Sequence, residues 1–197
     1  MKPTRLPHLL LLLALLAPLA GRAQDDAPPG QAALAGRWQL DAERSDDARD
    51  ALKDATRDVA GDLRPRGVRR PNPGGIRRSV PEQALGRDLF SAVRLPEHTL
   101  ELEVTTESVD FRRDAGASER IWTDGRPSVV DVDNPDVRLG AWEDDVLWVE
   151  RNSQRGTRVV EAWRREGEHL VAAFEIRNGL LEDPVTFELH FLRDPTE

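Results

Sequence analysis

After Pro96, apolar and polar residues alternate at every second position along most of the chain. In "HTLELEVTT" three apolar side chains alternate with Glu101 and Glu103, and "PVTFELHFL" near the C-terminus alternates just as strictly. A period of two is typical of strands that bury one face. Eight or nine such segments follow one another with short turns between them. This succession predicts an antiparallel meander rather than parallel βαβ units.

One more strand is expected earlier, in "GRWQLD", where Trp38 and Leu40 share a face opposite polar residues. Within the meander, turns are expected at residues 124–125, 143–145 and 166–167. A long meander leaves two unpaired edges unless it closes on itself. The sequence therefore predicts a mainly β fold, an antiparallel up-and-down β-barrel.

Residues 42–97 follow a different period. In "SDDARDALKDATRDVA" the apolar residues recur at helical spacing, and Ser45 is placed to cap the start of that helix. In "SVPEQALGRDLFSAVRL", Ser79 and Glu82 fit a capping box. The Gly- and Pro-rich stretch between them, residues 61–78, predicts a mobile loop. We expect two short helices and a basic loop inserted after the first strand.

The chain opens with the pattern of a secretory leader. Lys2 and Arg5 precede the unbroken apolar run Leu9–Ala17, and small residues lie where cleavage before Gln24 requires them. The run is shorter than the roughly 20 residues of a membrane-spanning helix. Residues 1–23 therefore predict a cleaved signal peptide. We expect a periplasmic or secreted protein with no integral membrane segment after cleavage.

Residues 24–33 are small, polar and Pro-rich, which predicts a flexible lead-in before a single domain over residues 34–197. Of 28 basic and 36 acidic residues, the leader holds only Lys2, Arg5 and Arg22, so cleavage leaves a net charge of −11. Binding to nucleic acid is not expected, because neutralising phosphates requires an excess of Lys and Arg. The chain has no cysteine, so the fold uses no disulfides.

The sequence contains no recognisable catalytic or metal-binding motif. His98, His169 and His190 lack the spacing of a metal site, no serine lies in a nucleophile-elbow setting, and there is no cysteine nucleophile. "DVDNPD" fails as a calcium loop, since Pro135 and Asp136 occupy the fifth and sixth positions. We expect no cofactor, no metal and no enzymatic activity. A two-carboxylate hydrolase stays open, because carboxylates are plentiful.

The basic loop carries six arginines against the single acidic residue Asp62, which gives residues 61–78 a charge of +5. Such a loop could bind an anionic partner, either envelope components or the phosphate and carboxylate groups of a ligand. Alternatively, it contacts the protein's own acidic surface or is simply solvated. The arginines concerned are Arg64, Arg66, Arg69, Arg70, Arg77 and Arg78.

The tryptophans of the later strands leave two alternatives. Strand alternation places Trp142, Trp148 and Trp163 opposite their aliphatic neighbours, unless a bulge shifts the register. If they point inward, Trp142 and Trp163 line a ligand cavity with Arg151 and Arg158 as polar anchors. If they point outward, they form an aromatic band for a partner or for sugar rings. Plain packing is the alternative to both.

The triplet Gly36-x-Trp38 on the first strand of an antiparallel meander resembles the lipocalin and fatty-acid-binding-protein superfamily, the calycins. The resemblance implies that Trp38 closes one barrel end and that an arginine of the last strand, Arg193, packs on it. It also implies an interior that either fills with side chains or admits one small molecule. The resemblance therefore implies a structural role for Gly36, Trp38 and Arg193.

The motifs "GRWQLDAERSDD", "LPEHTLELEVT", "TDGRP", "AWEDDVLWVER" and "RDP" resemble those of a group of exported bacterial proteins with no known activity, over residues 34–195. Together these resemblances imply an exported, non-enzymatic barrel that binds a small, partly apolar ligand. The alternative is a structural or interaction module at the cell envelope that uses the basic loop or the barrel exterior. The sequence leaves the oligomeric state open.

Overall fold

The computed structural model describes residues 27–62, 80–129 and 137–195. Ten strands form one antiparallel sheet in the order β4-β3-β2-β1-β10-β9-β8-β7-β6-β5, so that nearly every strand pairs with its neighbour in sequence. The strands are β1 (Gly36–Leu40), β2 (Thr99–Val104), β3 (Ser108–Arg113), β4 (Glu119–Trp122), β5 (Ser128–Val129), β6 (Val137–Glu143), β7 (Val146–Asn152), β8 (Arg158–Glu166), β9 (His169–Arg177) and β10 (Val185–Arg193).

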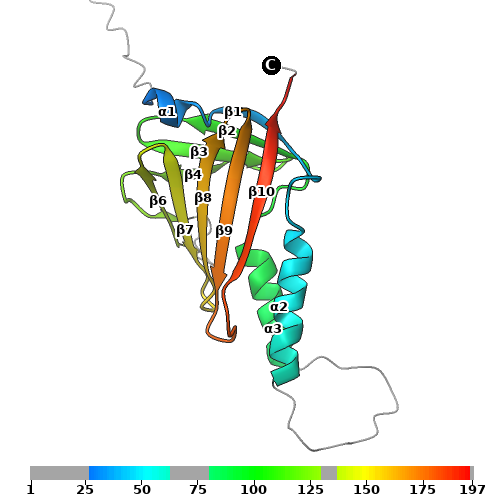
Figure 1. Ribbon diagram of the computed structural model, residues 1–197. Coiled ribbons are helices and arrows are strands. Elements are labelled where there is room, and N and C mark those ends of the chain that lie inside the picture. Colours follow the sequence, from blue (N-terminus) through cyan, green and yellow to red (C-terminus); the bar gives the residue numbers. More distant parts are fainter. Residues whose placement is uncertain (1–26, 63–79, 130–136, 196–197) are drawn as a thin grey trace, which may run out of the picture.

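The sheet curls until its two ends meet, so the strands enclose a nearly closed barrel. In Figure 1, β1–β4 cross behind the upright strands β6–β10. A single bridge joins Asp124 to Ala141 of β6, and the Trp122 N–H donates to the Ser128 hydroxyl at 3.1 Å. Gly140 permits this approach: a Cβ there would lie 2.5 Å from Ile121 Cγ2 and 2.6 Å from the Trp122 carbonyl oxygen. The predicted antiparallel barrel is confirmed.

Two helices follow β1, as predicted: α2 (Ala48–Asp62) and α3 (Val80–Ala92). They lie side by side next to β10 (Figure 1). The predicted cap of the first helix is wrong. The Asp47 carboxylate, not Ser45, accepts a first-turn N–H, that of Asp50 at 2.9 Å. The Ser45 hydroxyl instead accepts the His190 N–H at 2.9 Å, which ties the start of the insertion to β10.

The segment predicted as a flexible lead-in contains a short helix, α1 (Pro29–Ala32), whose proline at the first turn is pre-set for helical φ. The lead-in prediction is therefore wrong for these four residues. Residues 1–23, the six arginines of the basic loop and residues 134–136 lie outside the described ranges. None of the described helices is long and apolar enough to cross a membrane.

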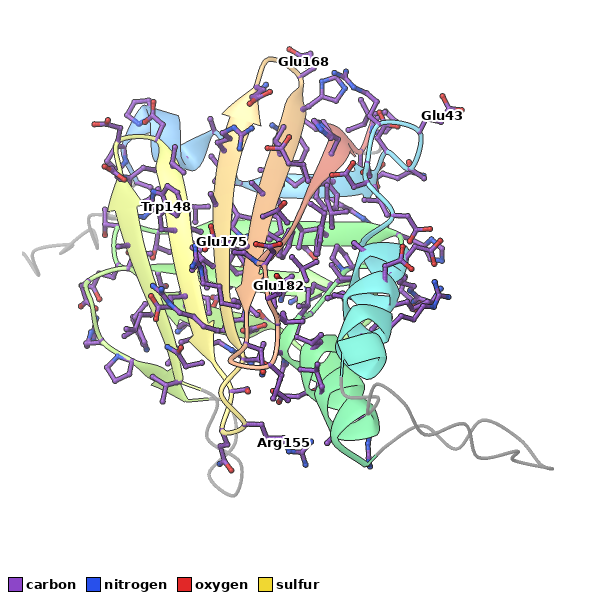
Figure 2. All side chains as sticks on the ribbon, turned by 60° about the horizontal axis from the view of Figure 1, so that its bottom comes forward. Glu43, Trp148, Arg155, Glu168, Glu175 and Glu182 are labelled. Carbon is purple, nitrogen blue, oxygen red and sulfur yellow. The ribbon has the colours of Figure 1, made fainter. Side chains whose placement is uncertain are left out.

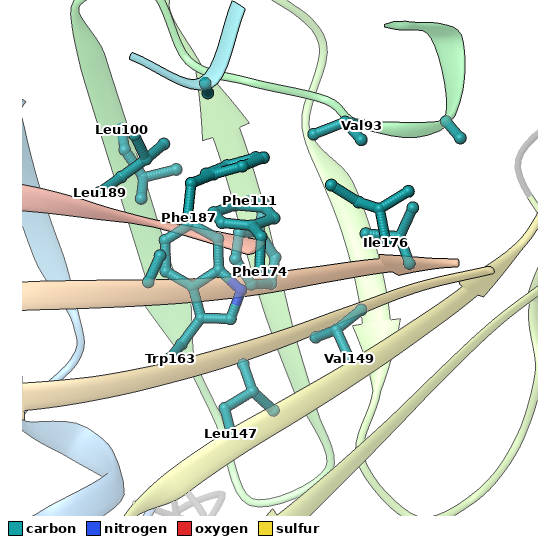
Figure 3. Close-up of a cluster of buried hydrophobic side chains, with 14 of the residues drawn as sticks. Val93, Leu100, Phe111, Leu147, Val149, Trp163, Phe174, Ile176, Phe187 and Leu189 are labelled. Atoms are coloured by element: carbon teal, nitrogen blue, oxygen red, sulfur yellow. The ribbon is translucent and has the colours of Figure 1, made fainter. Parts of the chain in front are cut away.

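The barrel interior is filled by side chains that alternate inward along each strand. Trp163 lies at its centre (Figure 3), with ring centroids 5.2 Å from Phe111, 6.0 Å from Phe174 and 6.1 Å from Phe191. Leu89 of α3 is fully buried in the same core. Trp163, Phe111 and Phe191 expose no surface, so no space large enough for water adjoins them.

Candidate functional site

Four charged residues are buried inside the barrel, and a fifth, Arg113, joins them with a side chain that is 11% exposed. On three strands an inward-facing charged residue lies two positions from an inward-facing apolar residue. Arg113 lies two positions after Phe111 on β3, and Arg151 lies two positions after Val149 on β7. On β8, Glu161 lies two positions before Trp163. Each strand therefore turns a charge inward because its side chains alternate strictly. We call these residues the lumen cluster: Arg113, Glu119, Arg138, Arg151 and Glu161.

Two carboxylates hold the three guanidinium groups together. Glu119 accepts from Arg113 Nη1 at 2.8 Å and from Arg151 Nη1 at 2.5 Å, and it also pairs with Arg138. Glu161 accepts from Arg151 Nε at 2.5 Å and from the indole N–H of Trp163 at 2.9 Å. Charge-assisted bonds of this kind are the strong ones in proteins. The aromatic core and the lumen cluster are therefore one connected structure.

The lumen cluster has more cationic donors than acceptors. Three arginines against two glutamates leave a formal charge of +1 in a largely buried place. Within the described part of the chain, buried guanidinium nitrogens donate no hydrogen bond: Arg113 Nε, Arg138 Nε and Nη2, and Arg151 Nη2. Buried donors are nearly always paired, so an unpaired set indicates a further acceptor. A single anionic group would supply both the charge and the acceptors.

The charges shift the ionisation of the cluster. Burial opposes ionisation of Glu119, but Arg151, Arg113 and Arg138 overcome it and lower the pKa of that carboxyl to about 2. Burial and the neighbouring charge of Arg151 together lower the pKa of Arg138 to about 10, although Glu119 opposes them. Burial also opposes the charge of Arg151, yet Glu161 and Glu119 raise its pKa. Arg138 and Arg151 therefore carry positive charge at neutral pH.

The hydrolase alternative does not fit the two buried carboxylates. A glycosidase-type pair needs one carboxylic acid that holds a proton at working pH. The pKa of Glu119 lies at about 2, and both carboxylates are engaged by Arg151. Glu119 therefore has no proton to give. Among the residues that the structure describes, no three metal-ligating side chains converge either.

The structure separates the four predicted ligand-binding residues. Trp163 and Arg151 are buried in the lumen, and half-buried Trp142 packs against the same core. Arg158 is on the outer face, where it pairs with Glu150 at 2.6 Å, so its prediction as a lumen anchor is wrong. The reason is strand register: Arg158 faces Asn152 across the ladder, one position from Arg151, and neighbouring positions point to opposite faces.

The three residues predicted to have a structural role, Gly36, Trp38 and Arg193, lie where β1 pairs with the C-terminal end of β10. Gly36 begins β1 with φ of 126°, in a region that favours glycine. Trp38 is fully buried and donates its indole N–H to the Leu34 carbonyl at 3.0 Å. The Arg193 guanidinium lies 5.4 Å from the Trp38 ring centroid, directly across the β1–β10 pairing.

Four members of the lumen cluster were missed in the sequence: Arg113, Glu119, Arg138 and Glu161. The signal was present for two of them. "SVDFRRD" and "VVEAWRR" each place a charge at the parity of the apolar residues, Arg113 with Val109 and Glu161 with Val159. A charged residue at an inward position of an otherwise apolar face is the pattern to look for.

Helix α3 covers the barrel end near Arg138 and is held there by a buried carboxylate. Asp88 accepts from the Ser153 hydroxyl at 3.0 Å and from the Thr157 hydroxyl, both in the β7–β8 turn. Asn178 donates to Thr157 at 2.9 Å and extends the network to the end of β9. These bonds fix α3 to the strand ends.

A groove of about 440 Å³ is lined by the start of α2, the residues just before it and the segment that leads into β2. Its floor includes Leu40, Leu95 and the lumen-facing Leu189. An exposed ion pair between Arg49 of α2 and Glu97, 2.5 Å long, lies at its rim.

The fold and the buried cluster define an antiparallel barrel of the calycin type, in which a charged group is enclosed by apolar walls. The chain is similar to lipid binding protein 8 of Caenorhabditis elegans, with 14% sequence identity, a TM-score of 0.50, and coverage of 85% of this chain and 99% of that one. At this identity the likeness shows the fold alone.

Two further solved structures have lower scores. A protein named REP1-NXSQ fatty acid transporter has a TM-score of 0.49 and 11% identity, over 84% of this chain and 99% of its own. The fatty-acid-binding protein of Manduca sexta has a TM-score of 0.44 and 12% identity, over 81% and 98%. No family model matches the sequence, and no curated protein matches it significantly.

Proposed function

We propose that this protein binds a small, partly apolar ligand with one negative charge inside its barrel and catalyses no reaction. The lumen cluster carries the proposal, because its charge of +1 and its unpaired guanidinium donors lack an anionic acceptor. The surrounding aromatic and aliphatic side chains suit the apolar part of such a ligand. The structural neighbour from Caenorhabditis elegans is a lipid binding protein, which agrees with this class of ligand.

The filled interior sets a condition on binding. Because Trp163 and its neighbours expose no surface, a ligand must take space that side chains now occupy. Helix α3 contributes the buried side chains of Leu85 and Leu89 to this core, and Val93 directly after the helix contributes a third. We infer that α3 moves outward when the ligand enters, with its apolar side chains replaced by the ligand's chain.

Calorimetric titration with decanoate tests the proposal directly. Removing one cation by Arg138→Met should weaken decanoate binding by about tenfold or more, because charge-assisted hydrogen bonds contribute about 1.5–3 kcal/mol. Arg158→Met is the matched control, since Arg158 is exposed on the outer face, and it should change the affinity less than about twofold. Arg138→Lys retains the charge and should bind decanoate more tightly than Arg138→Met.

Two results would overturn the proposal. One is the absence of any heat of binding for decanoate with the full-length, folded protein. The other is equal affinity of Arg138→Met and wild type, because the cluster would then have no part in recognition. Circular dichroism of each variant keeps loss of binding separate from loss of fold.

We also propose export of the mature chain to the periplasm or the medium. The leader pattern of Lys2, Arg5 and the run Leu9–Ala17 supports it. Mass spectrometry of protein recovered outside the cytoplasm should give a mature N-terminus at Gln24. Recovery of the intact chain with Met1 from the cytoplasmic fraction would contradict export.

The filled interior favours one alternative, an envelope interaction module that uses the barrel exterior or the basic loop. If the core never opens, the barrel serves only as a rigid support for its surface. Native mass spectrometry distinguishes the two: a co-purifying small anion supports the ligand binder. A ligand-free mass with concentration-dependent self-association supports the interaction module.

A further inference from the structure

The outer face of β7–β10 carries a second groove, of about 480 Å³, which lies outside the lumen. Pairing across four strands places Trp148, Ala162, Ala173 and Glu188 in one row. The two alanines form a low floor between a tryptophan on one side and a glutamate on the other. Figure 2 shows Trp148 and Glu175 on the strands of this face.

Trp148 differs from Trp38, Trp122 and Trp163 in what lies over its ring. Arg193 covers Trp38, Arg126 lies 4.2 Å from the Trp122 ring centroid, and phenylalanines surround Trp163. Trp148 is 39% exposed, and the described residues place no cation and no second aromatic ring against it. Among the described residues, its ring therefore has no cationic or aromatic neighbour.

The charged residues that line the groove are all acidic. They are Asp46, Glu175 and Glu188, whereas none of the lining residues is basic. Two arginines outside the lining pair with this rim, Arg164 with Glu188 at 3.2 Å and Arg177 with Glu175 at 2.5 Å, so the three carboxylates retain a net charge of −1. The face therefore combines an aromatic wall, an apolar floor and an acidic rim.

We propose that this groove binds a small organic cation with an apolar body, of the alkylammonium class. A tryptophan face attracts a cationic group that lies within about 6 Å of the ring. The carboxylates add long-range attraction for the same charge, and the floor of Ala162, Ala173 and Val160 accepts the alkyl part. The groove volume is in the range of small-molecule sites.

The groove faces away from the lumen and opposes it in charge, although Phe174 and Phe187 of the core also contribute to its lining. On β8, Glu161 and Trp163 point inward, whereas Val160 and Ala162 line the groove. A ligand of one site should therefore leave the other site unchanged. The two proposals can fail separately.

The test uses hexyltrimethylammonium, hexanoate and hexan-1-ol, which share one alkyl chain and differ in charge. The indole N–H signals of the full-length protein are assigned by single Trp→Phe variants. Hexyltrimethylammonium should shift the Trp148 signal and leave Trp163 unchanged. Its affinity should fall about tenfold in Trp148→Ala, and about threefold in Glu175→Gln. Added salt should weaken it.

Leu192→Ala is the control, because Leu192 is an exposed apolar residue outside the groove, 44% accessible, and it should leave the affinity unchanged. Equal shifts of Trp148 by all three probes would mean a plain apolar patch and would overturn the cation site. Absence of any Trp148 shift with hexyltrimethylammonium would overturn it as well. Neither result bears on decanoate binding to the lumen cluster.

Discussion

Arg138 on β6 and Arg151 on β7 lie directly opposite each other, both buried in the barrel, and both contact the single carboxylate of Glu119. Two like charges at paired positions of neighbouring strands repel each other. Burial makes that repulsion stronger than it would be in water. Glu119 is therefore the residue on which the cluster depends.

Replacement of Glu119 by Gln should destabilise the protein by about 3–5 kcal/mol, because it leaves buried arginines without their shared counter-charge. Urea unfolding at neutral pH measures the effect. Glu168→Gln removes a glutamate whose side chain is 85% exposed and should change the free energy of unfolding by less than about 0.5 kcal/mol. Similar stability of the two variants would show that Glu119 does not balance the arginines.

Stability should fall in acid through the titration of Glu119. The pKa of this carboxyl is about 2 in the folded protein and 4.5 when unperturbed, so the unfolded chain takes up its proton first as pH falls. The contribution is complete above about pH 5 and is lost as pH approaches 2. It amounts to on the order of 3 kcal/mol. Urea midpoints at several pH values should show this loss in wild type, and a smaller loss in Glu119→Gln.

Asp88→Ala should loosen α3 from the barrel. It removes the acceptor of the Ser153 and Thr157 hydroxyls and leaves both without their partner, at a cost of about 1–3 kcal/mol. Hydrogen exchange in α3 should accelerate more than exchange in β8. Asp54→Ala on α2, where the carboxylate is exposed, is the comparison. Unchanged protection of α3 in Asp88→Ala would rule out the anchoring role.

Gly140→Ala should strain the seam, the close contact between β4 and β6 that closes the barrel. The new methyl would meet the Trp122 carbonyl oxygen and Ile121 at about 2.5 Å, closer than carbon atoms approach without movement. Overpacking of this kind destabilises by about 1–3 kcal/mol. Gly179→Ala adds a methyl group where nothing lies within 4 Å and should be nearly neutral. Equal thermal midpoints for the two variants would contradict a close seam between β4 and β6.

Strand alternation predicted the fold well, because the apolar face after Pro96 is continuous and each turn residue has its own signal. Glycines with positive φ end β4 and β8, at Gly125 and Gly167, as the turn sequences indicated. The seam between β4 and β6 was not predictable, since it depends on how far the sheet curls and no local pattern records that.

The candidate site was predicted only in part. Arg151 and Trp163 were identified, but Arg158 was assigned to the wrong face, because a register one residue away reverses the direction of every side chain. Glu119 comes from a short strand of four residues, too short for alternation to show its facing. The cluster gathers residues from five strands, so only the closed barrel brings them together.

The indole N–H of Trp163 gives the most direct test of the lumen proposal, because it donates to Glu161 within the cluster. Nuclear magnetic resonance of the full-length protein during a decanoate titration follows this proton. An anion beside the three arginines should shift the Trp163 signal in a saturable manner and leave the exposed Trp148 signal in place. A titration in which Trp163 stays unchanged while decanoate binds elsewhere, or does not bind, would contradict an anion site in the barrel.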